Sequence, residues 1–225
     1  TLFKPGERVV IKVNGIVRGR SHPGLVMAVA ERLQEAGVKP DHITIFERVT
    51  DDLARGGFPV NLNGPGIRCR GTDGMFVDGW TVDGSAVRLS RILAECDALV
   101  NIPILKAFTI GGVSFCMKNH YGSFDIPWEF HGRRYAPGVT GINDLGPIRA
   151  RTRLVVGDVL SREFQEDITN YAIVGGSPSV LLSTDPIAHD RVGLQMASAA
   201  FEPTGANVRS FQAEAEGWLR AGAAL

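Results

Sequence analysis

Residues 9–47 read VVIKVNGIVRGRSHPGLVMAVAERLQEAGVKPDHITIFE, and this stretch decides the fold. The apolar runs at 9–14 and 43–47 are rich in β-branched residues, which is typical of buried strands. The residues between them carry a helical pattern. A strand, a helix and a second strand this close together form a βαβ unit, which has parallel strands and a right-handed crossover.

The helix of this unit has its own start and stop signals. Leu25, Val29 and Leu33 recur at the spacing of one helix face. Ser21 precedes the helix and is expected to act as its N-cap, with a proline in the first turn. Gly37 follows the last apolar position and is a good helix stop.

The later segments continue the alternation of strands and helices. We predict an α/β fold with a mainly parallel sheet flanked by helices, in Rossmann-like layering, within a single domain of residues 1–225. Further strands are predicted at 98–102, 153–158 and 180–183, helices at 85–95, 111–119, 185–200 and 211–221, and a loop-rich segment at 122–147.

Residues 55–85 differ from the rest of the chain in composition and in hydrophobic periodicity. Eight glycines fall among these 31 residues, and helical periodicity is nearly absent. The apolar runs on either side of Asp78-Gly79 are typical of a β-hairpin. We therefore predict a small β-rich insertion at 55–85 within the domain, and it is the best candidate for a dimer arm.

The composition argues against several classes of protein. Lysine plus arginine number 24 and aspartate plus glutamate also number 24, so the net charge is zero and no nucleic-acid partner is expected. No apolar run reaches the ~18 residues of a transmembrane helix, so no membrane insertion is expected. The three cysteines, Cys69, Cys96 and Cys116, lie far apart. A cysteine-ligated iron–sulfur cluster normally needs about four, so none is expected within this chain.

Polar residues follow most of the predicted strands. They are Asn14, Glu47, Asn101, Asp158 and the run at 183–185. Ligands bind at the carboxyl ends of the strands in open α/β sheets, so this set indicates a site at that edge. The alternative is that strand ends are polar only because the loops that follow them are polar.

The segment at 101–122 is the densest in candidate site residues. Lys106 follows a predicted strand, and Gly111-Gly112 stands at a predicted helix start, where free N–H groups favour anions. Lys118 lies near the end of the same helix. Two lysines in this setting suit a phosphate, a carboxylate or an enolate-like group, and a desolvated lysine can also act as a base. Alternatively, Lys118 simply extends its charge to solvent at a helix C-terminus.

Histidines and carboxylates form two groups that can hold a divalent cation. His120, Asp125 and His131 lie within twelve residues of one another, and Asp185 and His189 are one helical turn apart. Asp185 before a proline is also a standard N-cap sequence, so a purely structural role is the alternative for that residue.

Several standard catalytic motifs are missing. No Gly-x-Gly-x-x-Gly follows a strand, and the sequence lacks Walker A, Gly-x-Ser-x-Gly and His-Glu-x-x-His motifs. These absences argue against typical dehydrogenases, NTPases, α/β-hydrolases and zincins.

Three blocks of the chain resemble a known family, domain of unknown function 362. The first is VIKVN at 10–14 with the His22-Pro23 pair that follows it. The second runs from LVNIPILK at 99–106 through GVS at 112–114 to KNHYG at 118–122, and the third is LSTDPIAHD at 182–190. Their order and spacing span nearly the whole chain, and the second block is the most specific.

The resemblance carries expectations about biology. Members of this family are often described as iron–sulfur-centre proteins, and some are exported by the twin-arginine route. This implies a role in redox metabolism, with any iron–sulfur cluster supplied by a partner protein or by a missing segment. It leaves the location open between the cytoplasm and, if an upstream twin-arginine signal is removed, the periplasm. The chain departs from the family at Phe108, where histidine is common, at His189, where leucine is usual, and in having no ferredoxin-like cysteine domain.

The first functional hypothesis is an enzyme that acts on a small anionic or metal-associated ligand at the carboxyl edge of the sheet. The predicted catalytic residues are Lys106, Lys118 and Asp185. The predicted ligand-binding residues are Lys12, Asn14, Asn101, Gly111, Gly112, Asn119, Asp158 and Thr184, and the predicted metal ligands are His120, Asp125, His131 and His189.

Two alternatives belong to other classes. One is a non-catalytic metal- or cofactor-binding protein, or a subunit that partners an iron–sulfur protein. The other is a structural subunit whose motifs serve dimer packing. We expect a homodimer, and the cofactor stays unidentified, although a divalent metal would suit the histidines and carboxylates.

Overall fold

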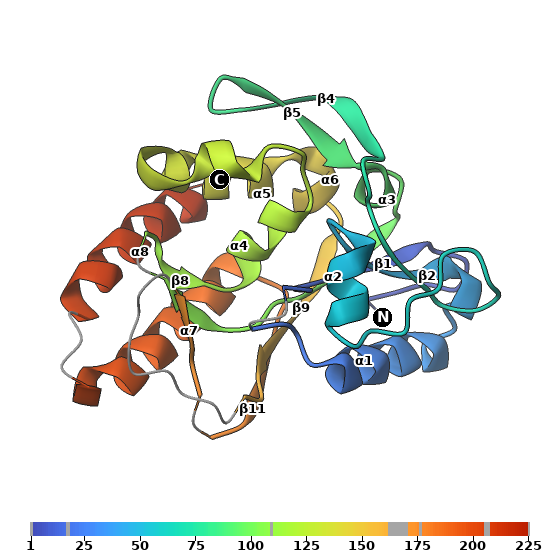
Figure 1. Cartoon of the computed structure of the whole chain (residues 1–225), viewed down its shortest axis with the longest axis horizontal. Coiled ribbons are helices and arrows are strands. Elements are labelled where there is room, and N and C mark those ends of the chain that lie inside the picture. Colours follow the sequence, from blue (N-terminus) through green and yellow to red (C-terminus); the bar gives the residue numbers. More distant parts are fainter. Residues whose placement is uncertain are drawn as a thin grey trace.

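The centre of the fold is a six-stranded sheet. The structure is a computed structural model that describes residues 2–16, 19–108, 110–161, 171–175, 177–204 and 208–224. Its strands lie in the order β11 (Ser179–Ser183), β9 (Thr152–Val159), β6 (Ala98–Ile102), β1 (Val9–Val13), β2 (Ile43–Glu47) and β3 (Arg68–Gly71). The strands from β9 to β3 run parallel, and β11 runs antiparallel to β9. The predicted α/β fold with a mainly parallel sheet flanked by helices is confirmed (Figure 1).

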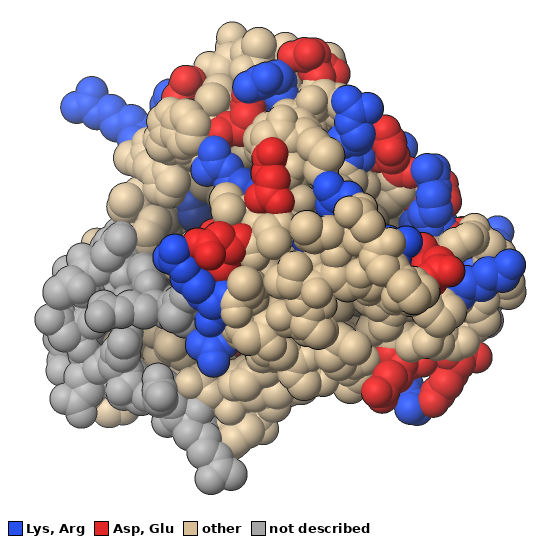
Figure 2. Space-filling model, turned by 45° about the vertical axis from the view of Figure 1, so that its right-hand side comes forward, with Lys and Arg blue, Asp and Glu red and all other residues tan. Residues whose placement is uncertain are grey.

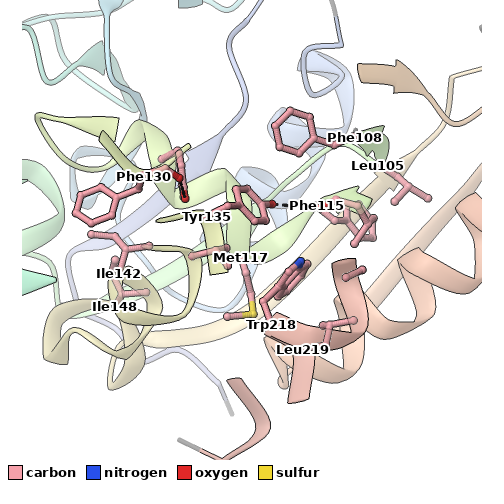
Figure 3. Packing of buried hydrophobic residues seen from close by; sticks show 14 of the residues in the cluster. Leu105, Phe108, Phe115, Met117, Phe130, Tyr135, Ile142, Ile148, Trp218 and Leu219 are labelled. Atoms are coloured by element: carbon pink, nitrogen blue, oxygen red, sulfur yellow. Dashed lines mark hydrogen bonds between the residues drawn. The ribbon is translucent and has the colours of Figure 1, made fainter. Parts of the chain in front are cut away.

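Two hydrophobic layers cover the two faces of this sheet. Alternation along β1 sends Val9, Ile11 and Val13 to one layer and Val10 to the other. The first layer includes side chains of α1 (Pro23–Glu35) and α2 (Thr50–Arg55), and the second those of α4 (Cys116–Asn119), α5 (Tyr135–Asp144), α7 (Pro186–Phe201) and α8 (Val208–Ala223). Figure 3 shows the aromatic centre of the second layer, where the rings of Tyr135 and Trp218 lie 6.4 Å apart.

A second, antiparallel sheet holds the segment that follows β6. Its strands are β10 (Tyr171–Ile173), β7 (Lys106–Phe108) and β8 (Gly112–Ser114), and Lys106 pairs with Ser114. The predicted helix at 111–119 is therefore wrong in its first half. A β7–β8 hairpin forms there, with Gly112 in the positive-φ conformation (76°) that glycine adopts readily. Only Cys116–Asn119 forms a helix, α4.

The predicted hairpin exists, but its turn is a different Asp-Gly pair. Strand β4 (Phe76–Val82) continues through Asp78-Gly79, where the pairing register shifts, and pairs with β5 (Ser85–Ser90). The turn is Asp83-Gly84, with φ of 46° and 76° at the two residues, which matches the right-handed twist of a hairpin. The pair forms its own two-stranded sheet at the top of Figure 1.

The predicted helix at 85–95 is wrong for most of its length. Val87 and Leu89 are buried while Arg88 between them is exposed, and this period of two is that of a strand. Pairing with β4 makes the segment β5, and only α3 (Arg91–Ala94) is helical.

The segment at 122–147 contains more helix than predicted. Pro137 is the third residue of α5, in a first turn where the missing N–H removes no intrahelical hydrogen bond, so this proline does not mark a loop.

The other helices are α6 (Gly146–Arg149) and the short 3-10 helices η1 (Pro40–His42), η2 (His120–Gly122), η3 (Pro127–Phe130), η4 (Gly132–Arg134) and η5 (Glu202–Thr204).

The helix ends agree only in part with the predicted caps. Ser21 does not cap α1, because its hydroxyl donates to the Ile102 carbonyl at 2.6 Å and accepts from Asn14 N at 3.0 Å. Gly37 has a φ of 95° directly after the C-cap of α1, as a helix stop requires. Asp185 caps α7 by accepting hydrogen bonds from two backbone N–H groups.

The surface reflects the balanced composition. Basic and acidic side chains are interspersed on the face shown in Figure 2, without a large field of one sign. Within the described ranges, no helix combines the length and apolar character needed to cross a membrane.

Candidate functional site

A cleft of about 350 Å³ opens at the carboxyl ends of β1 and β2, beside the point between β1 and β6 where the strand order reverses. The predicted site residues that line it are Asn14, Lys106, Lys118, Asn119 and His131. Its walls also include Glu47, Arg48, Asp52, Phe108, Ser114 and Tyr121. The structure thus brings together part of the predicted set.

Lys12 lies beneath the cleft in an ion pair with Glu47. It follows Val10 by two residues on β1, so it points to the same face of the sheet, and its side chain is fully buried. Its Nζ lies 3.1 Å from both carboxylate oxygens of Glu47 and also donates to the Val13 carbonyl. Burial lowers the pKa of Lys12, and Glu47 opposes that shift. Lys12 therefore holds the floor of the cleft together.

A network of hydrogen-bonded, buried polar groups extends from this ion pair. Asn119 Oδ1 lies 3.5 Å from Lys12 Nζ, and Asn119 Nδ2 donates to Asn101 Oδ1 at 2.7 Å. Asn101 Nδ2 lies 3.2 Å from His120 Nε2, whose ring partner Nδ1 contacts Ser123 Oγ at 3.1 Å. Burial lowers the pKa of His120 to about 3, so this ring is neutral. Asn101 and His120 support the cleft from behind, and Asn119 reaches its wall.

Lys118 places its amine over aromatic rings inside the cleft. Its Nζ lies 3.1 Å from the centroid of the Tyr121 ring and 3.0 Å from His131 Nε2. The ring centroids of Phe108 and Tyr135 are 5.4 and 5.1 Å away. Among the residues that the structure describes, no carboxylate lies within ion-pair distance of this amine.

Burial alters the ionisation of both lysines in the cleft. It lowers the pKa of Lys118 to about 6, and the charge of Lys106 adds to this effect. It lowers the pKa of Lys106 to about 8, where Glu47 opposes the shift and Lys12 adds to it. Lys106 stands on β7, and its Nζ donates to the Gly19 carbonyl at 3.4 Å. Both shifts favour the neutral amine, and the shift is larger for Lys118 than for Lys106.

Acidic and basic groups from β2 and the segment after it complete the wall. The carboxylate of Glu47 also accepts from the backbone N–H of Arg48 at 2.8 Å. Burial, with Glu47 adding, raises the pKa of Asp52. The Arg48 guanidinium donates to the Asp125 carbonyl at 2.7 Å and lies 5.1 Å from the centroid of the Trp128 ring. The cleft is thus of mixed sign.

The anion site expected at Gly111-Gly112 is not at a helix start, because Gly112 begins β8. The helix start that follows, at α4, points the backbone N–H groups of Cys116 and Met117 at the carboxylate of Asp190, at 2.7 and 2.9 Å. A carboxylate is favoured at a helix N-terminus. The start of the helix that does form here therefore faces an internal carboxylate, that of Asp190.

Thr184 and Asp185 lie away from the cleft because β11 runs antiparallel to β9. Ser183, at the end of β11, pairs with Val155, so the end of this strand lies toward the amino ends of the parallel strands. Asp185 Oδ1 accepts from the backbone N–H groups of the first turn of α7, at 2.8 and 3.0 Å. Thr184 lines a different hollow of about 170 Å³.

Asp158 lies at the expected edge of the sheet but does not line the cleft. Its fully buried carboxylate accepts from the backbone N–H of His22 at 2.6 Å and contacts His22 Nδ1 at 2.9 Å. This pair ties the end of β9 to the start of α1.

The four predicted metal ligands do not form one group. His120 belongs to the buried network, and Asp125 forms an ion pair with Arg88 at 2.8 Å. His131 contacts Lys118, and His189 is buried beside Asp190 with 3.3 Å between Nδ1 and Oδ1. The prediction grouped His120, Asp125 and His131 because they are close in sequence, but the chain turns between them. It grouped His189 with Asp185, which caps α7.

A different potential metal group exists in the described part of the chain. Cys116, His189 and Asp190 are buried, and their candidate ligand atoms lie within 4.8 Å of one another. Burial raises the pKa of the Cys116 thiol well above its usual value. His189 Nε2 is buried without a hydrogen-bond partner among the described residues, and a Cβ placed on Gly157 would lie only 2.3 Å from it.

Sequence reasoning missed several residues of the cleft. Tyr121 lies within the KNHYG block and so carried a usable signal, whereas Glu47 was already among the polar strand ends expected at this edge. Arg48 and Asp52 carried none, because no motif marks the start of α2. Phe108 contributes an aromatic ring beside Lys118.

Comparison with known proteins identifies the family and the fold. No curated protein matches the chain. The solved structure of the lactate racemase apoprotein from Thermoanaerobacterium thermosaccharolyticum is similar with a TM-score of 0.51 and 11% identity, over 88% of this chain and 50% of that chain. A crystal structure of a protein from Thermotoga maritima is similar with a TM-score of 0.45 and 12% identity, over 91% of this chain and 55% of that chain. This chain spans about half the length of both proteins.

At this level of identity, the likeness to the lactate racemase apoprotein shows a shared fold and nothing more. The family is shown by the sequence itself, because the profile described as "Domain of unknown function (DUF362)" matches residues 9–195. The blocks at 10–14, 99–122 and 182–190 all fall within that match. The chain therefore belongs to the DUF362 family.

Proposed function

We propose that this protein is an enzyme that binds a small organic anion in the cleft, with Lys106 as the anchoring cation and Lys118 as the reacting amine. One observation carries the proposal: the buried Lys106 and the half-buried Lys118 line a single cleft, and their pKa values are lowered to about 8 and about 6. Titratable groups whose environments push their pKa values apart are typical of acid–base and nucleophilic sites. A protonated Lys106 can hold a carboxylate while a neutral Lys118 acts on the same ligand.

The fold supports a small carboxylate as the ligand class. The structural neighbour is named a lactate racemase, and lactate is a small carboxylate. A cleft of about 350 Å³ is near the lower end of ligand pockets, which suits a ligand of a few carbon atoms. This support is at the level of the fold, since one fold hosts many reactions.

Binding of carboxylates should depend on Lys106. Isothermal titration with acetate, lactate and pyruvate measures this binding. We expect at least one of the three to bind the wild-type protein. Lys106→Met removes a charged hydrogen bond worth about 1.5–3 kcal/mol, so affinity should fall roughly 10- to 100-fold. Lys39→Met, at an exposed lysine outside the cleft, is the matched control and should bind as the wild type does.

The pH dependence of that binding has a definite sign. A carboxylate prefers the protonated lysine, so affinity should stay high near neutral pH and decline as the pH rises through about 8, the pKa of Lys106. Unchanged affinity of Lys106→Met, or affinity that rises through this range, would remove Lys106 from the site.

A second candidate function is binding of a metal or metal-containing cofactor by Cys116, His189 and Asp190. It is favoured by their clustering and by the orphaned His189 Nε2. Elemental analysis of protein purified without an affinity metal, compared with His189→Leu, tests it: stoichiometric metal that the variant loses supports this function. The redox role, the iron–sulfur partner and the homodimer remain predictions from the family resemblance.

A further inference from the structure

We propose that a second site, beside β3, binds a phosphoryl group through Arg68 and Arg70. Both arginines line a hollow of about 290 Å³, which we call the arginine hollow. Its wall includes Val9 at the start of β1 and His42 just before β2, so it lies toward the amino ends of these strands. The cleft lies at their carboxyl ends, and the second site is therefore independent of the proposed function.

The strand pattern places both arginines on one face of the sheet. Arg68 and Arg70 are two residues apart on β3, so their side chains point the same way, while Cys69 between them packs into the hydrophobic layer on the other face. The pairing register sets Thr44 of β2 beside Arg68, and Thr44 also lines the arginine hollow. Two guanidinium groups and a hydroxyl group, all hydrogen-bond donors, thus meet there.

Neither arginine has an anionic partner within the described part of the chain. Most of the described arginines form an ion pair with a carboxylate. Arg68 instead donates from Nη1 to the Gly66 carbonyl at 3.2 Å, and Arg70 Nη2 lies 3.5 Å from Met75 Sδ, a weak acceptor. Two guanidinium charges on one strand are therefore left for a ligand.

Arg70 also carries a buried donor that lacks an acceptor. Its Nε–H group is buried without a hydrogen-bond partner among the described residues. A charged donor that leaves water without gaining an acceptor costs free energy, and such groups are rare in native proteins. Because Arg70 lines the arginine hollow, an oxyanion bound there can supply the missing acceptor. This orphaned donor points to a ligand.

The carboxylates in the wall do not neutralise the two arginines. Glu95 pairs with Arg91 at 3.6 Å, and Asp41 accepts a hydrogen bond from a backbone N–H group. Arg8, also in the wall, pairs with Asp97 at 3.0 Å. The two arginines of β3 therefore face one acidic group that has no ion pair, and the arginine hollow keeps a positive charge that attracts anions.

A phosphoryl group suits this arrangement better than a carboxylate does. One guanidinium fork binds two oxygens of an anion, so two forks can use more oxygens than a carboxylate offers. A phosphate monoester has three terminal oxygens and a charge of about −1.5 to −2 at neutral pH. Leu62 and Ile92 also line the arginine hollow, and these apolar side chains suit an organic group attached to the phosphate.

Amide chemical shifts of the ¹⁵N-labelled chain, followed during titration with phosphate compounds, test the site. The probes are inorganic phosphate and phenyl phosphate, with acetate at the same ionic strength as the carboxylate control. We expect saturable shifts at residues 41–44 and 62–70 with both phosphates, tighter binding of the ester, and no saturable shifts there with acetate. The wild-type map locates the site without any variant.

Arginine variants then test which side chains bind the phosphoryl group. Arg68→Gln and Arg70→Gln each remove a charged hydrogen-bond donor, so affinity for phenyl phosphate should fall about tenfold or more in each. Arg209→Gln, at an exposed arginine of α8 outside the arginine hollow, is the matched control and should bind as the wild type does. The amide spectrum of each variant reports whether it is folded.

The outcomes separate the site from its alternatives. Inorganic phosphate that binds as tightly as the ester, or more tightly, supports the site and identifies free phosphate as its ligand. The proposal is overturned if neither phosphate gives saturable shifts, if acetate binds the arginine hollow equally well, or if the shifts cluster at residues 106–122 of the cleft. Unchanged affinity in both glutamine variants also overturns it.

Discussion

At the scale of single residues, the floor of the cleft depends on how closely the chain approaches one carboxylate. Glu47 accepts from Lys12 Nζ, from the Gly15 backbone N–H at 2.9 Å and from the Arg48 backbone N–H at 2.8 Å. A Cβ on Gly122 would lie 2.0 Å from Glu47 Oε1 and 2.8 Å from Lys12 Nζ. The glycine of the KNHYG block is therefore required by this buried ion pair.

Gly122→Ala should be strongly destabilising. The added methyl group must push Glu47 away from Lys12, and breaking a buried ion pair costs about 3–5 kcal/mol. Urea unfolding followed by circular dichroism measures the loss. Gly146→Ala is the control, because a Cβ there meets no atom within 4 Å, and it should change the free energy of unfolding little. Equal midpoints for the two variants would contradict this role of Gly122.

At the scale of elements, the direction of one strand decides which polar residues meet. The prediction that the polar residues after β11 join the cleft assumed a parallel strand. Because β11 is antiparallel, Thr184 and Asp185 leave the sheet toward the other edge, where Asp185 caps α7. Likewise, the β7–β8 hairpin replaces a helix and sets Lys106 opposite Ser114, with both in the wall of the cleft.

Asp185→Ala should affect stability and not ligand binding. Loss of an N-cap costs about 0.5–2 kcal/mol, so the urea midpoint should fall while the affinity for carboxylates stays at the wild-type value. Asp185→Asn, which can still accept the same hydrogen bonds, should recover most of the stability. Loss of carboxylate binding in both variants would show that Asp185 takes part in ligand binding.

At the scale of the whole molecule, the cleft collects side chains from segments far apart in the sequence. Glu47 comes from β2, Lys106 from β7, Lys118 from α4 and His131 from between η3 and η4. The charged groups that meet there are of both signs, as they are on the outer surface in Figure 2. The net charge of zero thus accompanies a cleft of mixed sign.

The pH dependence of unfolding should reveal the lowered pKa of Lys118. The folded-state pKa of Lys118, about 6, lies below its unfolded value of about 10.4, so between them the unfolded chain binds more protons and stability rises with pH. Lys118→Met removes this contribution. Urea midpoints measured at about pH 6.5 and about pH 8.5 should therefore increase less in Lys118→Met than in the wild type, and identical increases would show that the amine titrates normally.

The elements that local pattern specifies were predicted well. The predicted strands at 9–14, 43–47, 98–102, 153–158 and 180–183 agree with β1, β2, β6, β9 and β11, and the helices at 185–200 and 211–221 agree with α7 and α8. The errors fall where a short strand gains its stability from a partner, as in β5 and β8. Pairing across a hairpin outweighs the weak helical propensity of such segments.

The sequence by itself determined the α/β class, the family and the edge of the sheet where the cleft lies, because apolar periodicity and strand ends are local properties. Only the tertiary structure decided which polar residues share that cleft. It placed Asn101 and His120 behind the wall, turned Asp158 toward His22 and sent Asp185 to the opposite edge. The physical reason is that strand direction, pairing register and burial depend on contacts between distant segments, and burial in turn lowers the pKa of Lys118.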